Sequence, residues 1–420
     1  MSNAAKVIVG ALLIVGCGRT GLGPLTDESV ADGGFDEGPT IDEDRDPAEP
    51  DDPRPPVDPP LPESCGNGII EPGELCFMPQ ITFWSRIDPC SLDIGDLDGD
   101  GHLDVITPNS DFDHIETDDN LTSVLYGNGL GWLSDPVAHD TVDDIPVGVR
   151  VGDIDGNGQL DAVVVNSDAG SISVMINGGQ QEFLDAGRIG VGDNPVIADL
   201  GDVDGDGILD VAVAGNNQVM LSRGRGDGTF LPPTSYSSEG QLWDTLLVDI
   251  NGDERLDMLA TNTTTNAVVL WQGNGAGSMN AYGSLVMPGR PLGITTWDVD
   301  HNGTVDLLVA HAIGVEVLLG DGTGGFTSVA TVEAGLDPRA IAVADFDNDQ
   351  RPDAAILNST SQDITMTVGR GGGQFEYGAT YGVGSLPSGI RAGDFNGDGV
   401  PDLVVSNQLS NNIGLILSNP

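Results

Sequence analysis

Basic side chains are scarce in this sequence. Its 420 residues include 15 Lys and Arg against 66 Asp and Glu, which gives a formal net charge of −51. Such a chain repels the phosphates of nucleic acids and anionic lipids, so we exclude nucleic acid as a partner. Lysine occurs only at Lys6, and without a later lysine Schiff-base and lysine-base chemistry are excluded as well.

Other residues with catalytic chemistry are also few. The five histidines are scattered, aromatic residues make up 5% of the chain, and neither Gly-x-Ser-x-Gly nor His-Glu-x-x-His occurs. These absences favour a protein that is not an enzyme. The apolar run Val7–Val15 is too short to cross a bilayer as a helix, and we expect contact with a membrane only through a lipid.

The N-terminal residues have the order of an export signal. Lys6 precedes the apolar run, and Ile14-Val15-Gly16-Cys17 resembles the bacterial lipobox, in which a small residue precedes a lipidated cysteine. We therefore predict a lipoprotein signal peptide over residues 1–16 and lipidation of Cys17. This implies export to the cell envelope, with the outer membrane or cell surface as the expected location.

The next two segments are predicted to be a tether and a small loop. Fourteen acids and two arginines lie between Asp27 and Glu63, together with many prolines, so we expect residues 17–63 to be a disordered, extended tether. Residues 64–76 resemble a partial cysteine-rich segment of secreted myxobacterial proteins. We predict a disulfide between Cys65 and Cys76, and we expect Cys90 to be buried at the start of a strand.

One acidic pattern recurs through the rest of the chain, residues 77–420. Asp394-Phe-Asn-Gly-Asp-Gly-Val-Pro-Asp402 has six earlier copies, and successive copies start 57, 49, 47, 49, 47 and 49 residues apart. Each copy has oxygen side chains at positions 1, 3, 5 and 9, and glycine at position 6 suits a turn with positive φ. Calcium requires six to eight such oxygens, partly from carboxylates and partly from carbonyl groups. We therefore predict up to seven Ca²⁺ ions.

The predicted ligands come from positions 1, 3, 5, 7 and 9, with position 7 acting through its carbonyl group. They are Asp96, Asp98, Asp100, His102 and Asp104; Asp153, Asp155, Asn157, Gln159 and Asp161; Asp202, Asp204, Asp206, Ile208 and Asp210; Asp249, Asn251, Asp253, Arg255 and Asp257; Asp298, Asp300, Asn302, Thr304 and Asp306; Asp345, Asp347, Asp349, Arg351 and Asp353; and Asp394, Asn396, Asp398, Val400 and Asp402. Glu254 and Gln350 replace glycine at position 6, so occupancy of the loops that start at Asp249 and Asp345 is left open.

The repeated unit reads as four short strands. A proline lies seven residues before the first Asp in six copies, with Leu242 as the exception, and Gly-, Asn- and Asp-rich turns separate short apolar runs. This predicts an all-β fold, a seven-bladed β-propeller of four-stranded blades. The last copy lacks a fourth strand, and we expect the segment Gln80–Ile87 to supply it and close the ring.

These repeats resemble the FG-GAP and VCBS repeats of integrin α-subunits and bacterial surface proteins. The resemblance implies the propeller fold, calcium at the matching Asp and Asn positions, and surface binding or adhesion as the usual role. We expect a monomeric, non-enzymatic surface lipoprotein that binds an extracellular or envelope protein or a glycan. The alternative is an extracellular polysaccharide lyase or hydrolase on the same scaffold, which requires Tyr, His and Arg side chains converging on one face.

Two further expectations concern the inside and the ends of the ring. Asp93, Arg150, Asp199 and Arg391 each lie three residues before a first Asp, so they should meet around the channel as ion pairs. We expect the ligand to bind on the face opposite the calcium loops, where sequence varies most between copies. The candidate residues there are Trp243, Asp244, His311 and Arg339. The alternative for Trp243 is a packing role, in which it fills the gap left by the missing proline.

Overall fold

The structure is a computed structural model that describes residues 75–110, 121–140 and 145–418. The predicted signal peptide, the lipidation site Cys17, the tether and Cys65 lie outside these residues, so those predictions and the Cys65–Cys76 disulfide stay predictions. Cys90 is 4% exposed and lies just before strand β2, as expected. No helix within the described residues is long and apolar enough to cross a membrane.

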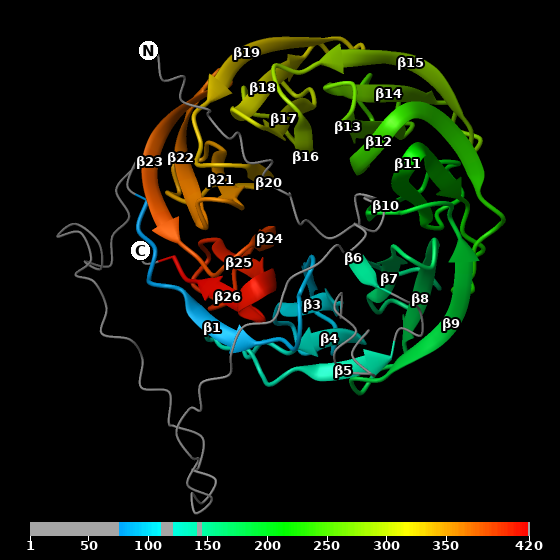
Figure 1. Ribbon diagram of the computed structural model, residues 1–420, viewed down its shortest axis with the longest axis horizontal. Coiled ribbons are helices and arrows are strands. Elements are labelled where there is room, and N and C mark those ends of the chain that lie inside the picture. Colours follow the sequence, from blue (N-terminus) through cyan, green and yellow to red (C-terminus); the bar gives the residue numbers. More distant parts are fainter. Residues whose placement is uncertain (1–74, 111–120, 141–144, 419–420) are drawn as a thin grey trace, which may run out of the picture.

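The described chain forms β-sheets arranged radially around a central channel (Figure 1). Each sheet begins with an inner strand at the channel and ends with an outer strand at the circumference. The four-stranded sheets contain β2 to β5 (Asp93–Gly95, Asp104–Asn109, Leu121–Leu125, Val137–Asp140), β6 to β9 (Pro146–Gly152, Asp161–Asn166, Ser171–Asn177, Phe183–Gly190), β16 to β19 (Pro291–Trp297, Asp306–His311, Gly314–Gly320, Phe326–Val332) and β20 to β23 (Pro338–Ala344, Asp353–Asn358, Asp363–Gly371, Gln374–Gly382).

The remaining four-stranded sheet closes the ring by joining the two ends of the described chain. It contains β24 (Pro387–Gly393), β25 (Asp402–Asn407), β26 (Asn412–Ile416) and β1 (Ile81–Trp84), with the short 3₁₀ turn η1 (Gln408–Ser410) between β25 and β26. Strand β1 pairs antiparallel with β26, from Ile81 opposite Leu415 to Trp84 opposite Asn412. The prediction that the segment around β1 supplies the missing strand is confirmed.

The prediction of seven four-stranded blades is wrong, because the described residues form six sheets. The sixth sheet has six strands in the order β10-β11-β12-β13-β14-β15 (Ile197–Gly201, Asp210–Ser222, Thr234–Val248, Asp257–Asn262, Ala267–Gly273, Met279–Val286). The first half of β12 pairs with β11, and its second half pairs with β13.

The fused boundary lies at Leu242, the residue at the proline position of the fourth copy. The prolines of other copies pair with the end of a second strand just as Leu242 does, for example Pro146 with Asn166, so the difference lies in the pairing of the residue before this position. Leu242 keeps its N–H and pairs with Asn262, while Gln241 beside it still pairs with Asn216. The chain therefore continues as one 15-residue strand across the boundary.

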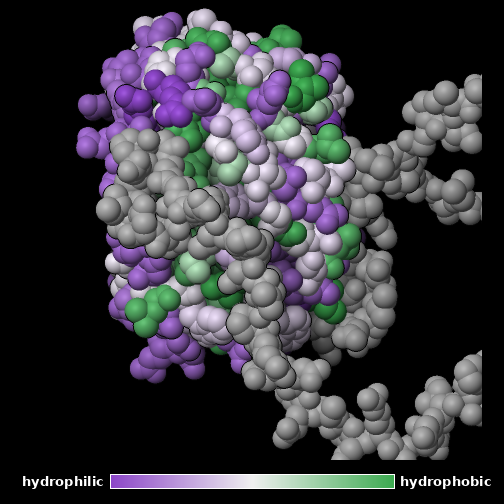
Figure 2. Space-filling view, turned by 90° about the vertical axis from the view of Figure 1, so that its left-hand side faces the viewer, coloured by the Kyte–Doolittle hydropathy of each residue, from purple (hydrophilic) through white to green (hydrophobic). Residues whose placement is uncertain are grey.

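The core lies between neighbouring sheets. The second strand of five sheets is buried at every residue, as in β7 and β25, because both of its faces pack against a neighbouring sheet. In one cluster, Val163 and Val165 of β7 pack with Val211 and Val213 of β11. Outer strands such as β15 and β19 are largely exposed. On the side of the ring shown in Figure 2, hydrophobic residues form only small scattered groups.

Candidate metal loops and channel mouth

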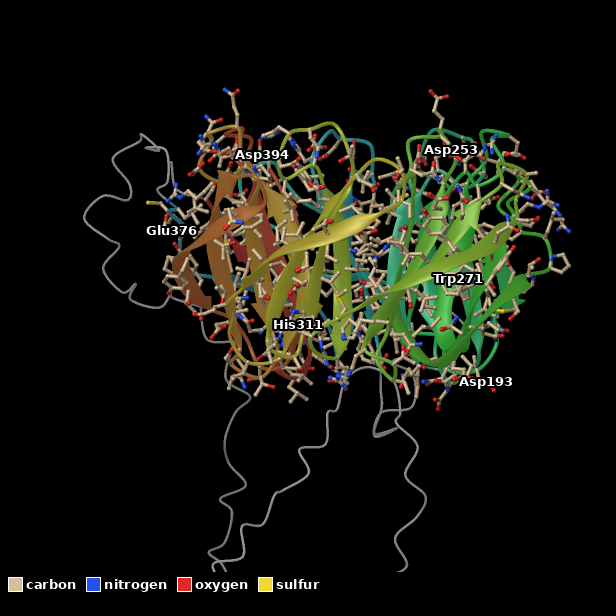
Figure 3. The ribbon with its side chains drawn as sticks, turned by 90° about the horizontal axis from the view of Figure 1, so that it is seen from above. Asp193, Asp253, Trp271, His311, Glu376 and Asp394 are labelled. Carbon is tan, nitrogen blue, oxygen red and sulfur yellow. The ribbon has the colours of Figure 1, made fainter. Side chains whose placement is uncertain are left out.

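All seven acidic loops connect an inner strand to the second strand, so they share one rim of the ring. Figure 3 shows Asp253 and Asp394 on this rim and Asp193 on the opposite rim. We call the first the loop rim and the second the opposite rim. The second strand starts at the position-9 aspartate in every copy, for example at Asp306 for β17 and Asp353 for β21.

The loop backbone is held by the first aspartate. In the loop that starts at Asp202, Oδ1 accepts a hydrogen bond from the N–H of Gly205 at 2.7 Å and Oδ2 accepts one from Gly207 at 2.8 Å. Position 4 and position 6 both have positive φ in all seven copies. Glu254 and Gln350 adopt φ of 64° and 68°, so the two loops without glycine at position 6 still keep the common backbone path.

The acidic side chains of five loops converge closely enough to hold one cation each. Their carboxylate oxygens lie within 4.8 Å of one another, which matches two ligands on opposite sides of an ion with bonds of about 2.3–2.6 Å. The converging sets are Asp96, Asp98 and Asp104; Asp153, Asp155 and Asp161; Asp202, Asp204 and Asp206; Asp298, Asp300 and Asp306; and Asp345, Asp347 and Asp353. Because every donor is an oxygen atom, these sets fit a hard cation such as Ca²⁺.

The loops that start at Asp249 and Asp394 differ from these five at position 3. They carry Asn251 and Asn396 there, so only an amide oxygen is available at that position. The amide nitrogen of Asn251 donates to Asp257 at 3.2 Å, and that of Asn396 donates to Asp398 at 2.9 Å. These two loops therefore lack the position-3 carboxylate that every converging set contains, and their metal ligands remain predictions.

The position-9 aspartate has a structural role that the sequence analysis missed. Oδ2 of Asp306 accepts the N–H of Val299 at 2.8 Å, and Oδ1 accepts the N–H of Gly320 at 2.8 Å. The same pair of bonds, to position 2 and to the end of the third strand, occurs at Asp104, Asp161, Asp210, Asp257, Asp353 and Asp402. Each carboxylate thus joins the loop to the third strand of its own repeat.

Burial also changes the acidity of these aspartates. Asp104 and Asp353 are 0% exposed, and burial raises the pKa of each carboxyl group to about 7, with further increases from neighbouring loop acids. A dication in the loop would favour the ionised form, since an opposite charge lowers a carboxyl pKa. In the loop that starts at Asp345, a positive charge already lies beside one of the acids, because Nη1 of Arg351 is 3.8 Å from Oδ2 of Asp349.

The inner strands carry the charges predicted to meet in the channel. Asp93 and Arg391 form an ion pair at 2.9 Å, and Arg150 lies 3.7 Å from Asp199. These contacts confirm the expected pairing. The second carboxylate oxygens are also used, because Asp93 accepts the N–H of Val151 at 3.0 Å and Asp199 accepts that of Leu247 at 2.8 Å. Around them lies a cavity of about 340 Å³.

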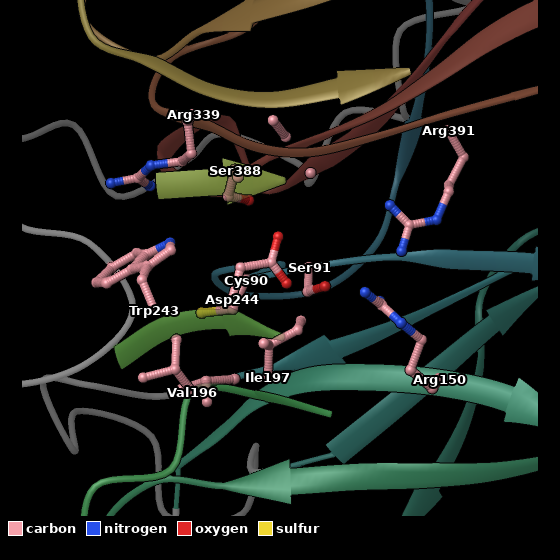
Figure 4. Close-up of a pocket in the computed structure, with 14 residues that line it drawn as sticks. Cys90, Ser91, Arg150, Val196, Ile197, Trp243, Asp244, Arg339, Ser388 and Arg391 are labelled. Atoms are coloured by element: carbon pink, nitrogen blue, oxygen red, sulfur yellow. The ribbon is translucent and has the colours of Figure 1, made fainter. Parts of the chain in front are cut away.

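On the opposite rim the channel opens into a second pocket of about 90 Å³, which we call the channel mouth. Figure 4 shows Trp243 and Arg339 on one side of it, Arg150 and Arg391 on the other, and Asp244 between them. The Arg339 guanidinium carbon lies 5.7 Å from the centre of a Trp243 ring, over its face. The structure therefore brings together three of the four residues predicted for the ligand face.

His311, the fourth residue predicted for the ligand face, does not line the channel mouth. It is 0% exposed, and its Nε2 lies 3.6 Å from Oε2 of the buried Glu316. Burial lowers the pKa of His311. His311 occupies the place of Asn109, Asn166 and Asn358, which are all fully buried at the ends of second strands.

Radial sheets around a channel, with acidic loops gathered on one rim, define a β-propeller with repeated loop sites. The family model of the FG-GAP-like repeat matches five overlapping stretches of this chain, 153–213, 202–260, 249–309, 298–356 and 345–405. Together they cover more than half of the chain. The chain belongs to this family. Each matched stretch starts at the first aspartate of one loop and ends beyond the next loop.

Solved structures with the same fold have unlike roles. BBS1N, in complex with ARL6DN, has a TM-score of 0.59 at 9% identity over 83% of this chain and 98% of its own. An Agrocybe aegerita lectin specific for non-reducing terminal N-acetylglucosamine has a TM-score of 0.52 at 17% identity, over 77% and 86%. A putative 6-phosphogluconolactonase from Bacteroides uniformis scores 0.59 at 13% identity, over 75% and 91%. At these identities the likeness shows the fold alone, and no curated protein matches the sequence.

Proposed function

We propose that this protein is a calcium-stabilised, non-enzymatic surface lipoprotein whose propeller binds an extracellular or envelope protein or a glycan. In this proposal Cys17 carries the lipid, residues 17–63 hold the domain away from the membrane, and the ring acts as a monomer. Calcium ions bound in the acidic loops stabilise the native state, since a ligand that binds only the folded protein shifts the folding equilibrium towards it.

The convergence of the acidic side chains in five loops on one rim is the observation that carries this proposal. If these groups hold cations, the loop rim is chemically occupied, and the channel mouth on the opposite rim is left for the ligand. The channel mouth combines an aromatic ring with charged side chains, as small-ligand sites commonly do. In the described residues, the channel and its mouth are lined by Asp and Arg but by no Tyr, His or Lys, so the cluster required by the lyase alternative is not assembled there.

The proposal is tested by a glycan array and a pull-down from envelope fractions. Both use the full chain carrying Cys17→Ala, so that no lipid is attached, with and without EDTA. We expect a specific protein or glycan to bind in calcium and to be lost when EDTA destabilises the ring. Trp243→Ala at the channel mouth should weaken binding, and His102→Ala on the loop rim should preserve it. Loss of binding only in His102→Ala would place the ligand on the loop rim and contradict the proposal.

A further inference from the structure

One charged side chain at the channel mouth lacks a partner of opposite charge. Arg391 has Asp93 as its ion-pair partner and Arg150 has Asp199, so these two arginines are compensated within the channel. Asp244 accepts hydrogen bonds from the N–H groups of Thr245 at 2.9 Å and Ile294 at 3.1 Å, and it lies in the field of Arg150. The remaining charged group of the pocket is Arg339.

Arg339 is buried without an acidic partner. Its residue is 5% exposed, its Nε has no hydrogen-bond partner, and among the described residues no carboxylate oxygen lies within 4 Å of its guanidinium group. Asp337 is the acid nearest to Arg339 in the sequence, but its Oδ1 pairs with Nη2 of Arg290 at 3.7 Å. Burial lowers the pKa of Arg339. A buried, unpaired cation is unfavourable unless something else neutralises it, and here it lines a pocket that a ligand can enter.

The surroundings of Arg339 restrict the chemistry of that ligand. The guanidinium carbon of Arg339 lies over the face of Trp243, and the Nε–H edge of the guanidinium group has no protein partner in the described part of the chain. Two parallel N–H groups on that edge match the two oxygens of a carboxylate. Asp244 lines the same pocket and can accept hydrogen bonds from hydroxyl groups, and it would repel a second carboxylate on the same ligand.

We infer that the channel mouth binds a sugar acid, with its single carboxylate on Arg339 and its hydroxyl groups donating to Asp244. The inference rests on the proposed function, because it names the ligand class of the same site. The pocket of about 90 Å³ is small, and it shares Arg150, Asp244 and Arg391 with the cavity of about 340 Å³ in the channel. The net charge of −51 disfavours a polyanion, whose many charges would meet an acidic surface, whereas one carboxylate meets one unpaired cation.

Isothermal titration of the full chain in calcium tests this inference. The probes are glucuronate, galacturonate and gluconate, with glucose as the neutral control. We expect at least one of the acids to bind with a stoichiometry of one, and glucose to bind far more weakly. Arg339→Gln should weaken the binding of that acid by about thirtyfold or more, as expected when one partner of a buried charge pair is removed.

Two further variants separate a binding role from a structural one. Arg339→Lys keeps the charge without the planar fork, and we expect intermediate binding. Arg370→Gln removes an exposed arginine near the end of β22 that pairs with Glu376 of the outer strand β23 at 2.8 Å, away from the inner strands of the channel, and it should bind as the wild type does. The melting temperature of Arg339→Gln should equal or exceed that of the wild type, because an unpaired buried charge is removed.

Three results would overturn the inference: no binding of any of the three acids, equal binding of glucose, or unchanged binding in Arg339→Gln. The glycan array and pull-down decide the proposed function separately. A ligand captured there with equal strength by wild type and Arg339→Gln would leave the proposed function standing and remove the sugar acid. A wild-type chain that captures nothing in the array and pull-down would contradict the proposed function itself.

Discussion

Replacing a position-9 aspartate should destabilise the ring even when no calcium is present. In Asp306→Ala the buried N–H groups of Val299 and Gly320 both lose their acceptor. Each unsatisfied buried donor costs about 1–3 kcal/mol, so we expect the variant to lose about 2–6 kcal/mol of unfolding free energy. Asp306→Asn keeps one acceptor oxygen and should lose about half as much.

The matched control is Asp300→Ala in the same loop. Asp300 belongs to the same converging set, but it accepts a hydrogen bond from the loop N–H of Asn302, near the surface, at 3.1 Å. Its loss should therefore matter only when a cation is bound. Thermal melts of the wild type and the three variants, each recorded in calcium and in EDTA, separate the two roles of position 9.

We expect Asp306→Ala to melt well below the wild type in both calcium and EDTA. Asp300→Ala should melt below the wild type in calcium and together with it in EDTA. If Asp306→Ala and wild type melt at the same temperature in EDTA, the two backbone hydrogen bonds do not stabilise the ring. The fixed aspartate at position 9 would then be explained by metal binding alone.

Four further expectations follow from the same geometry. EDTA should lower the melting temperature of the wild type markedly, because the loops lose their ligands, and an unchanged curve would remove calcium as a folding ligand. Gly273→Ala should destabilise the folded protein by more than about 1 kcal/mol, since an added Cβ would lie 2.0 Å from the carbonyl oxygen of Leu256. Gly283→Ala on the exposed strand β15 serves as the control, because its added Cβ would meet open space. Burial raises the pKa of Asp199 to about 6, so the folded state binds more protons than the unfolded state between about pH 4 and 6, and this group's contribution to stability falls as pH rises through that range. The melting temperature of Asp199→Asn should therefore rise relative to wild type over the same range, by the equivalent of about 3 kcal/mol. A difference independent of pH would contradict the assignment. In a bacterial host, a labelled fatty acid should be incorporated into the wild type and not into Cys17→Ala, and equal labelling of both would exclude Cys17 as the lipid site.

The period and turn chemistry of the repeat were enough to predict the propeller, because each copy specifies its strands through local signals. The closing strand β1 was predictable for the same reason, since the last copy is visibly one strand short. The boundary at Leu242 was not. The missing proline is visible in the sequence. Whether β12 continues across the boundary, however, depends on its pairing with both β11 and β13, which is a tertiary property.

The candidate site, too, was predictable from the sequence only in part. The convergence of the loop acids follows from spacing within nine residues, and the structure keeps it in five loops. The second role of Asp306 was hidden because a fixed aspartate fits metal binding and backbone capping equally well. His311 was misplaced because its type suggested function, although its equivalence to the buried Asn109 was visible in the repeat. The contact of Arg339 with Trp243 joins two different repeats, and no local pattern predicts it.

The pairing of β1 with β26 has a consequence for the order of events during biosynthesis. Strand β1 emerges among the first described residues, yet its partner is made about 330 residues later, so a long segment must be complete before this contact can form. The early repeats can pack against their neighbours while the chain is still emerging, because their strands are local in sequence. A chain cut short before β26 would keep most of its sheets and expose two unpaired strand edges. Quality control that recognises such edges would therefore detect an incomplete chain by its open ring.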